Sequence, residues 1–248
     1  MATLLERQLS LSEGGGIRDI GQRVKILEDE AYLFVGLGGT GADALLHVKN
    51  EVMSRIILPT DAAGVPTAEA PEEIGFLEID TDTTTKEKTY GSAHFDESRG
   101  EFCDISVTDL PGVISEVIVQ KRFGADCWQW AENGILSSAG NIRPARQVSR
   151  LCLAWNIDRA VNSVREKIRQ LTLHCRTYTL TIFLFSGISG VTGSGILLDM
   201  AYLLRKIGHC IVPDVQVLGY LMTPDVNPGG GESEAMRANG FACLKELD

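Results

Sequence analysis

Two glycine-rich segments interrupt this sequence, and each follows a short apolar run and precedes a helical pattern. The first, residues 36–41, comes after the apolar run 32–35, and apolar residues at helical spacing follow it through residue 57. The second, residues 186–195, comes after the β-branched and aromatic run 177–185 and precedes a helical segment at 196–207. Both segments therefore predict a strand, a glycine-rich turn and a helix in succession.

The rest of the chain repeats this alternation. Strands are predicted at 75–79 and 215–222, one or two helices at 144–173, and a last helix ending at 247, whereas residues 83–140 give no clear pattern. Strands that alternate with helices favour an α/β fold, here a three-layer Rossmann-like domain with a mainly parallel sheet. We expect an N-terminal arm over residues 1–30 and one domain over residues 31–248.

A glycine-rich turn between a strand and a helix brings backbone N–H groups toward an anion at the positive end of the helix. Gly36, Gly38 and Gly41 match the spacing G-x-G-x-x-G, which also occurs in dinucleotide-binding folds. Such folds place an acid about 20 residues on, whereas the nearest acids at a strand end here, Glu78 and Asp80, lie about twice as far away. A nicotinamide or flavin site therefore has less support but stays open.

The second segment favours a polyphosphate held from two sides. Turns on neighbouring parallel strands would enclose it, with hydroxyl donors from Thr192 and Ser194 and the N–H groups of residues 190–195 as an anion nest. The chain has no Gly-Lys dipeptide, which excludes a Walker-type loop. We therefore expect phosphate to be held without the lysine of such a loop.

Charge and composition exclude several classes of protein. The formal net charge is −10, which disfavours nucleic-acid binding, because a negative field repels a phosphate backbone. The most apolar run, residues 180–185, is far shorter than the ~20 residues of a membrane-spanning helix. The N-terminus has no secretory h-region and the six cysteines form no CxxC pair, so we expect a cytoplasmic protein with reduced thiols and no zinc site.

Residues 186–195, Ser-Gly-Ile-Ser-Gly-Val-Thr-Gly-Ser-Gly, resemble the signature loop G-G-G-T-G-[ST]-G of the tubulin/FtsZ superfamily. The first turn, Gly-Leu-Gly-Gly-Thr-Gly, is similar to that of bacterial tubulin-like proteins, with Asp43 where FtsZ often has Asn. Asp80-Thr81-Asp82 resembles the N-T-D after the second strand of the family, residues 138–141 its γ-phosphate loop, and residues 223–225 the loop before its ribose-contacting helix.

The resemblance implies a GTP- and GDP-binding protein, with Mg²⁺, that self-assembles head to tail into nucleotide-dependent filaments and is a GTPase when complete. It assigns no catalytic residue and no metal ligand in this chain. The implied nucleotide contacts are Gly36, Leu37, Gly38, Gly39, Thr40, Asp43, Asp80, Ser138, Ala139, Gly140, Asn141, Gly187, Ser189, Gly190, Val191, Thr192, Gly193, Ser194, Gly195, Thr223 and Glu234.

The sequence also departs from the family pattern. Ser189 and Val191 replace two signature glycines, residues 83–137 form a longer link than usual, and the Glu-Arg pair of the ribose helix lacks its spacing of four. The family continues beyond the point that matches residue 248, with a central helix, an acidic catalytic loop and a second domain. We therefore expect the 248 residues alone to show little GTP turnover and to expose apolar surface.

Two alternative functions stay open at this point. One is a Rossmann-type NAD(P)-dependent oxidoreductase that uses only the first turn. The other is an interaction module that retains the fold without nucleotide. Arg143, Arg146 and Arg150 lie at helical spacing, and they either face phosphate or a neighbouring subunit or belong to a solvated face.

Overall fold

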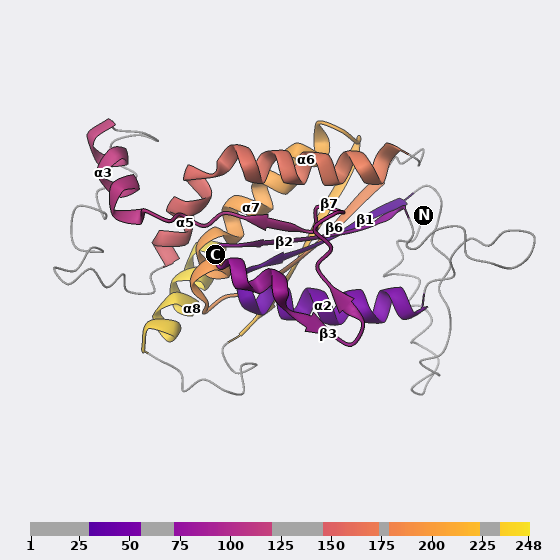
Figure 1. Cartoon of the computed structure of the whole chain (residues 1–248), viewed down its shortest axis with the longest axis horizontal. Helices are drawn as coiled ribbons and strands as arrows, with labels where there is room; N and C mark the ends of the chain where they lie inside the picture. Colours follow the sequence, from indigo (N-terminus) through magenta and orange to yellow (C-terminus); the bar gives the residue numbers. More distant parts are fainter. Residues whose placement is uncertain (1–29, 56–71, 121–145, 174–178, 224–233) are drawn as a thin grey trace, which may run out of the picture.

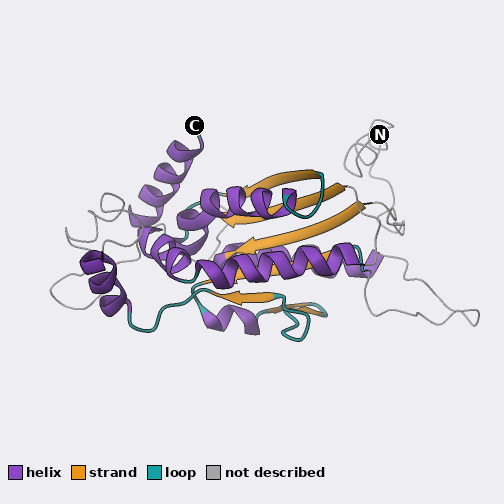
Figure 2. Cartoon of the chain, turned by 90° about the horizontal axis from the view of Figure 1, so that it is seen from above, coloured by secondary structure: helices purple, strands orange, loops and turns teal. Residues whose placement is uncertain are grey.

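The computed structural model describes residues 30–55, 72–120, 146–173, 179–223 and 234–248. Five strands form one sheet in the order β5-β2-β1-β6-β7, and every neighbouring pair is parallel. Figure 2 shows the strand arrowheads pointing toward one end of the molecule. The α/β fold with a mainly parallel sheet is thus confirmed. The strands are β1 (Glu30–Leu37), β2 (Ile74–Asp80), β5 (Phe102–Asp104), β6 (Thr179–Gly187) and β7 (Asp214–Met222).

Helices cover both faces of the sheet (Figure 1). On one face lies α2 (Gly38–Arg55), and on the other lie α6 (Ile157–Leu173) and α7 (Val191–His209). Side chains along β1 point alternately to the two faces of the sheet. Tyr32 packs in the hydrophobic cluster that includes α2, whereas Leu33 and Val35 pack in the cluster that includes α6 and α7. This is the three-layer arrangement expected from the sequence.

Residues 83–140 gave no clear pattern in the sequence, and their described part forms short helices and strands. A 3₁₀ helix, η1 (Thr83–Glu87), follows β2, and then a hairpin of β3 (Thr89–Tyr90) and β4 (Ala93–His94) contacts α2. Beyond β5, α3 (Leu110–Gln120) packs on α5 (Arg146–Trp155). These strands have two or three residues each, which is too short for a periodic pattern to appear in the sequence.

Helix α7 begins at Val191, five residues before the predicted start at 196, so the second half of the second glycine-rich segment is helical. Glycine costs roughly 1 kcal/mol in a helix interior, and close packing compensates for it here. A Cβ atom at Gly195 would overlap the carbonyl oxygen of Arg146 and the hydroxyl of Ser149 on α5. The first turn of α7 therefore packs directly on α5.

The connections diverge at the centre of the sheet. The chain leaves β1 for β2 on one side and leaves β6 for β7 on the other, although β1 and β6 are neighbours. In open α/β sheets, ligands bind at such a switch point, outside the carboxyl ends of the strands. Helix α8 (Glu234–Leu247) also lies near this end, because Asn239 donates a hydrogen bond to the Ser189 carbonyl at 3.3 Å.

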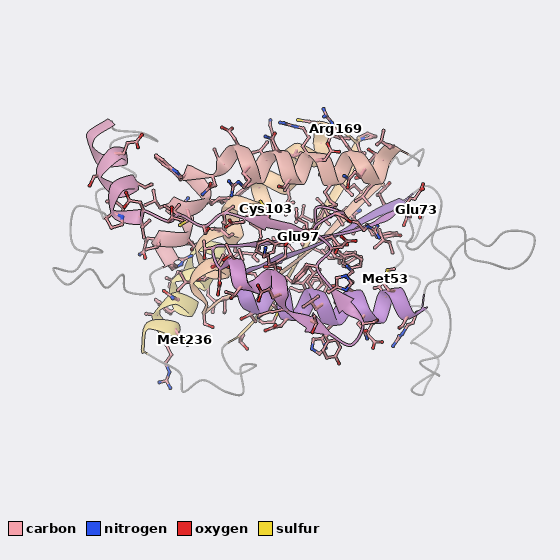
Figure 3. The ribbon with its side chains drawn as sticks, viewed as in Figure 1. Met53, Glu73, Glu97, Cys103, Arg169 and Met236 are labelled. Carbon is pink, nitrogen blue, oxygen red and sulfur yellow. The ribbon has the colours of Figure 1, made fainter. Side chains whose placement is uncertain are left out.

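Figure 3 shows the two ends of the molecule through labelled residues: Glu73, just before β2, lies far from Met236 on α8. Within the described residues, no helix is both long and apolar enough to cross a bilayer.

Candidate functional site

A cavity of about 250 Å³ lies at the carboxyl ends of β1, β2 and β6, at the switch point of the sheet. Three segments far apart in the sequence line it: the first glycine-rich turn, the residues at the end of β2 and beyond, and the second glycine-rich turn. In that order they contribute Leu37, Gly38, Gly39 and Thr40; Asp80, Asp82, Thr84, Thr85 and Lys88; and Gly187, Gly190, Val191, Thr192 and Gly193.

The two glycine-rich turns pack directly against each other. Gly38, the first residue of α2, has φ +70°, a conformation that glycine adopts without strain. A Cβ atom there would lie 2.9 Å from Cβ of Thr192, and one at Gly187 would lie 2.9 Å from Cβ of Thr40. The turns therefore form one surface, and side chains at these glycines would force them apart.

The segment after β2 is fixed to both the sheet and the second turn. The buried carboxylate of Asp80 accepts hydrogen bonds from Thr85 Oγ1 at 2.7 Å and from the Asp82 N–H at 3.2 Å. The hydroxyl groups of Thr81 and Thr192 lie 2.7 Å apart and share a hydrogen bond. Together these bonds close the cavity on the side of β2.

Two of the charged residues that line the cavity, Asp82 and Lys88, differ in sign. The Asp82 carboxylate accepts hydrogen bonds from the N–H and the hydroxyl of Thr84, which lower its pKa and favour its charged form. Lys88 Nζ donates to the carbonyl oxygen of Gly39 at 2.9 Å and to Asp43 Oδ1 at 2.7 Å. A lysine thus reaches the first turn from a distant part of the chain.

A buried acid, Glu78 on β2, lies directly beside Gly36 in the first glycine-rich turn. It pairs in register with Gly36 on β1, and a Cβ atom at Gly36 would overlap its Oε2. Neither carboxyl oxygen has a hydrogen-bond partner within bonding distance. Burial, and then the charge of Asp80, raise the pKa of Glu78 well above its usual value, although Lys88 and the nearby Gly38 N–H oppose the rise.

Ten of the residues expected to contact nucleotide line this one cavity. Nine of them come from the two glycine-rich turns, each of which follows a strand in the centre of the sheet, and Asp80 ends β2. These ten are Leu37, Gly38, Gly39, Thr40, Asp80, Gly187, Gly190, Val191, Thr192 and Gly193.

Several other expected contacts point elsewhere. Ser194 is buried and its hydroxyl donates to the Gly190 carbonyl, and Gly195 faces α5, so neither lines the cavity. Ser189 is also buried and does not line it. The helical turn that begins α7 directs Ser194 and Gly195 away from the cavity.

Three further expected contacts do not line the cavity. Gly36 lies beneath the first turn, Asp43 is paired with Lys88, and Thr223 is exposed at the end of β7. Residues 138–141 lie outside the described residues, as does the side chain of Glu234 at the start of α8.

Four lining residues were absent from the expected contacts: Asp82, Thr84, Thr85 and Lys88. Their signal in the sequence is the polar run that follows β2 directly. The carboxyl ends of parallel strands meet at one edge of the sheet, so residues that follow such a strand lie at the same edge as the two turns.

Residues 33–248 match the model of the protein family described as tubulin like. The chain belongs to the tubulin-like family. Among solved structures, this tubulin-like chain is similar to CetZ from Methanosaeta thermophila, with 14% sequence identity and a TM-score of 0.49. The match covers 87% of the tubulin-like chain and 42% of CetZ, so the chain spans less than half the length of that relative. No curated protein sequence gives a significant match.

Proposed function

We propose that this tubulin-like protein binds GTP and GDP, together with Mg²⁺, in the cavity between its two glycine-rich turns. We also propose that it is a cytoplasmic protein whose subunits assemble head to tail into nucleotide-dependent filaments. Guanine specificity, assembly and location rest on membership of the family. The phosphate site rests on the geometry of the cavity.

The observation that carries the phosphate site is the convergence of two helix N-termini on one cavity. Helices α2 and α7 begin at Gly38 and Val191, and both residues line it. The N-cap residue of α7, Gly190, makes no side-chain hydrogen bond to the first N–H groups of the helix. Each helix end supplies about half a unit of positive charge and N–H donors that suit a phosphate.

The acids at the rim fit a magnesium ion that is bound mainly through phosphate. Mg²⁺ usually takes one or two carboxylates, substrate phosphates and waters. Asp82 is exposed and favours its charged form, whereas both oxygens of Asp80 already accept hydrogen bonds. Among the described residues no cluster of three or more His, Cys, Asp or Glu side chains could hold a metal alone. We assign Asp82 to the magnesium side of the nucleotide.

The size of the cavity suits the phosphate tail. Sites that enclose a whole small molecule measure about 300–1,000 Å³, and this cavity has about 250 Å³. Ribose and base would therefore lie against neighbouring residues.

A dinucleotide remains the second candidate, because Asp80 ends the strand next to β1, as the ribose-binding acid of such folds does. However, both oxygens of Asp80 already accept hydrogen bonds, from Thr85 and Asp82, which leaves this carboxylate less available to a ribose.

Isothermal titration of the purified chain with GTP, GDP, ATP and NAD, each with Mg²⁺, tests the proposal. We expect saturable binding of GTP and GDP that exceeds that of ATP and NAD. Saturable binding of NAD without binding of GTP would favour the oxidoreductase and contradict the proposal. Binding of none of the four would favour a module that retains the fold without nucleotide.

A further inference from the structure

We propose that Lys88 is a phosphate-binding residue, whose ammonium group leaves Asp43 and the Gly39 carbonyl to contact the phosphate nearest the first glycine-rich turn. The inference deepens the proposed function, since it requires a polyphosphate in this cavity. It does not require that the base is guanine.

The backbone holds Lys88 firmly at the edge of the cavity. Lys88 is the C-cap residue of η1, and its N–H donates to the Thr85 carbonyl at 3.2 Å. The other end of η1 is capped by Asp82, and Thr85 is bound to the buried Asp80. The stem of Lys88 therefore starts from a fixed point.

The tip of the side chain lies over the first turn. Lys88 lines the cavity, and its Nζ lies 2.9 Å from the carbonyl oxygen of Gly39. A Cβ atom added at Gly39 would lie only 3.5 Å from that nitrogen. Gly39 is the second residue of α2, so the ammonium group lies beside the N–H groups that would face phosphate.

The charge around the cavity requires such a group. Among the described residues that line it, Lys88 alone is positively charged, whereas Asp80 and Asp82 are acids. Asp43 lies directly beside the same turn. Half a charge from each helix end is small against a polyphosphate next to these acids, so a mobile cation is needed in addition to Mg²⁺.

The present partner of Lys88 is easily exchanged. The Asp43 side chain is 61% exposed, and an ion pair between groups so open to water is weak. Lysine carries a compact charge on a flexible stem, so its Nζ can turn from Asp43 to a phosphate oxygen without movement of the backbone. Asp43 would then be released to water, where a carboxylate is well solvated.

The test is isothermal titration of inorganic tripolyphosphate with Mg²⁺, with GTP in parallel, into the parent chain and four variants. Lys88→Met should weaken tripolyphosphate and GTP binding about tenfold to a hundredfold, by loss of a charged hydrogen bond. Lys88→Arg should retain most of the affinity. Lys86→Met is the matched control, because Lys86 pairs with exposed Glu97 and does not line the cavity, and it should bind like the parent.

The variant Asp43→Asn distinguishes a direct contact between Lys88 and phosphate from a purely structural role of Lys88. If Lys88 acted only by holding Asp43 and the first turn in place, Asp43→Asn would weaken binding as much as Lys88→Met. We expect Asp43→Asn to bind tripolyphosphate at least as tightly as the parent, since it removes the competing partner. Raising the salt concentration should shrink the difference between the parent and Lys88→Met. Thermal unfolding followed by circular dichroism confirms that each variant is folded.

The outcomes for Lys88 and for the proposed function differ. Tripolyphosphate binding by folded Lys88→Met that equals that of the parent would overturn the inference and leave the nucleotide site standing. Binding of tripolyphosphate but not GTP by the parent, with a weaker Lys88→Met, would support the inference and contradict guanine nucleotide binding. If the parent binds neither probe, both proposals are wrong.

Discussion

The carboxyl group of Glu78 is buried at a position where burial favours the uncharged form. It occupies the space that Gly36 leaves empty, is fully buried, and has no hydrogen-bond partner within bonding distance. Burial is the largest cause of its raised pKa. The neutral form is therefore favoured beneath a turn that we propose carries phosphate, which spares the site one negative charge.

Glu78→Gln should remove a pH dependence of stability. The folded protein keeps the Glu78 proton at pH values where the unfolded chain, with a pKa near 4.5, has lost it. The free energy of unfolding of the parent therefore falls as pH rises from about 4.5 toward the folded pKa, by up to about 1.4 kcal/mol per pH unit for this group. Relative to the parent, Glu78→Gln should gain stability over that window.

Urea denaturation at intervals from pH 4 to pH 7.5 measures this difference. Glu166→Gln, at an exposed position of α6, supplies the baseline for removal of an ordinary surface carboxylate. A difference between Glu78→Gln and the parent that stays constant over the series would show that the buried acid does not hold its proton.

The sequence could predict single contact residues only where the glycine-rich turns, or the resemblance of residues 80–82 to a family motif, indicate them. It could not show that Ser194 and Gly195 turn away, because this depends on α5, whose Arg146 and Ser149 pack against the start of α7. Likewise, Lys88 follows a stretch with no periodic pattern, and the tertiary structure alone brings it to Gly39.

Among the elements, the central strands were predictable for a physical reason. Strands covered by helices on both faces read as continuous apolar runs, so the sequence shows β1, β2 and β6 to within a few residues. Strand β5 has only three residues, too few to form a recognisable apolar run, so only its pairing with β2 identifies it.

Arg146 joins three helices, and Arg146→Ala should destabilise the protein by about 2–3 kcal/mol. Its guanidinium group donates to both carboxylate oxygens of Glu246 on α8, at 2.7 and 2.6 Å, and to the Ser194 carbonyl on α7 at 2.6 Å. Because Arg146 is buried, its loss leaves that carbonyl without its donor. The midpoint of urea unfolding measures the effect.

Arg150→Ala is the matched control one turn further along α5. Arg150 pairs with Asp199 at the surface, where such pairs contribute little, so its removal should change stability by no more than about 0.5 kcal/mol. Equal losses in the two variants would contradict the role given to Arg146. The sequence had left both arginines open between a phosphate contact, a subunit contact and a solvated face.

At the scale of the whole molecule, β7, α7 and α8 all carry exposed apolar side chains. The apolar surface expected from the resemblance is thus present. Its exposed members are Tyr202, Leu218, Tyr220, Leu221, Phe241, Leu244 and Leu247. An exposed apolar surface of this kind promotes association and binds hydrophobic dyes.

Phe241→Glu should reduce the fluorescence of the dye ANS with the native chain, since Phe241 is 66% exposed on α8, which carries two more exposed apolar side chains, Leu244 and Leu247. The free energy of unfolding should change by about 0.5 kcal/mol or less, because the side chain is mainly in water. Leu173→Glu, at the exposed end of α6, is the control and should leave the dye signal near that of the parent. Equal signals from the parent and Phe241→Glu would exclude this surface as the dye site.

The central claim, that phosphate lies between the two glycine-rich turns, is tested most directly by a side chain added at Gly190. A Cβ atom at Gly193 would collide with Ser186, Gly187 and Leu37, so a change there would disturb the fold as well as the site. Gly190 lines the cavity in an extended conformation, with φ −68° and ψ 163°, and a Cβ atom there meets no atom within 4 Å.

The deciding measurement is therefore isothermal titration of GTP with Mg²⁺ into Gly190→Val and into Gly219→Val. Gly219 on β7 has the same open surroundings but lies outside the cavity. We expect Gly190→Val to lose GTP binding by at least a hundredfold while it unfolds at the temperature of the parent, and Gly219→Val to bind like the parent. Unchanged GTP affinity in folded Gly190→Val would contradict a phosphate site between the two turns.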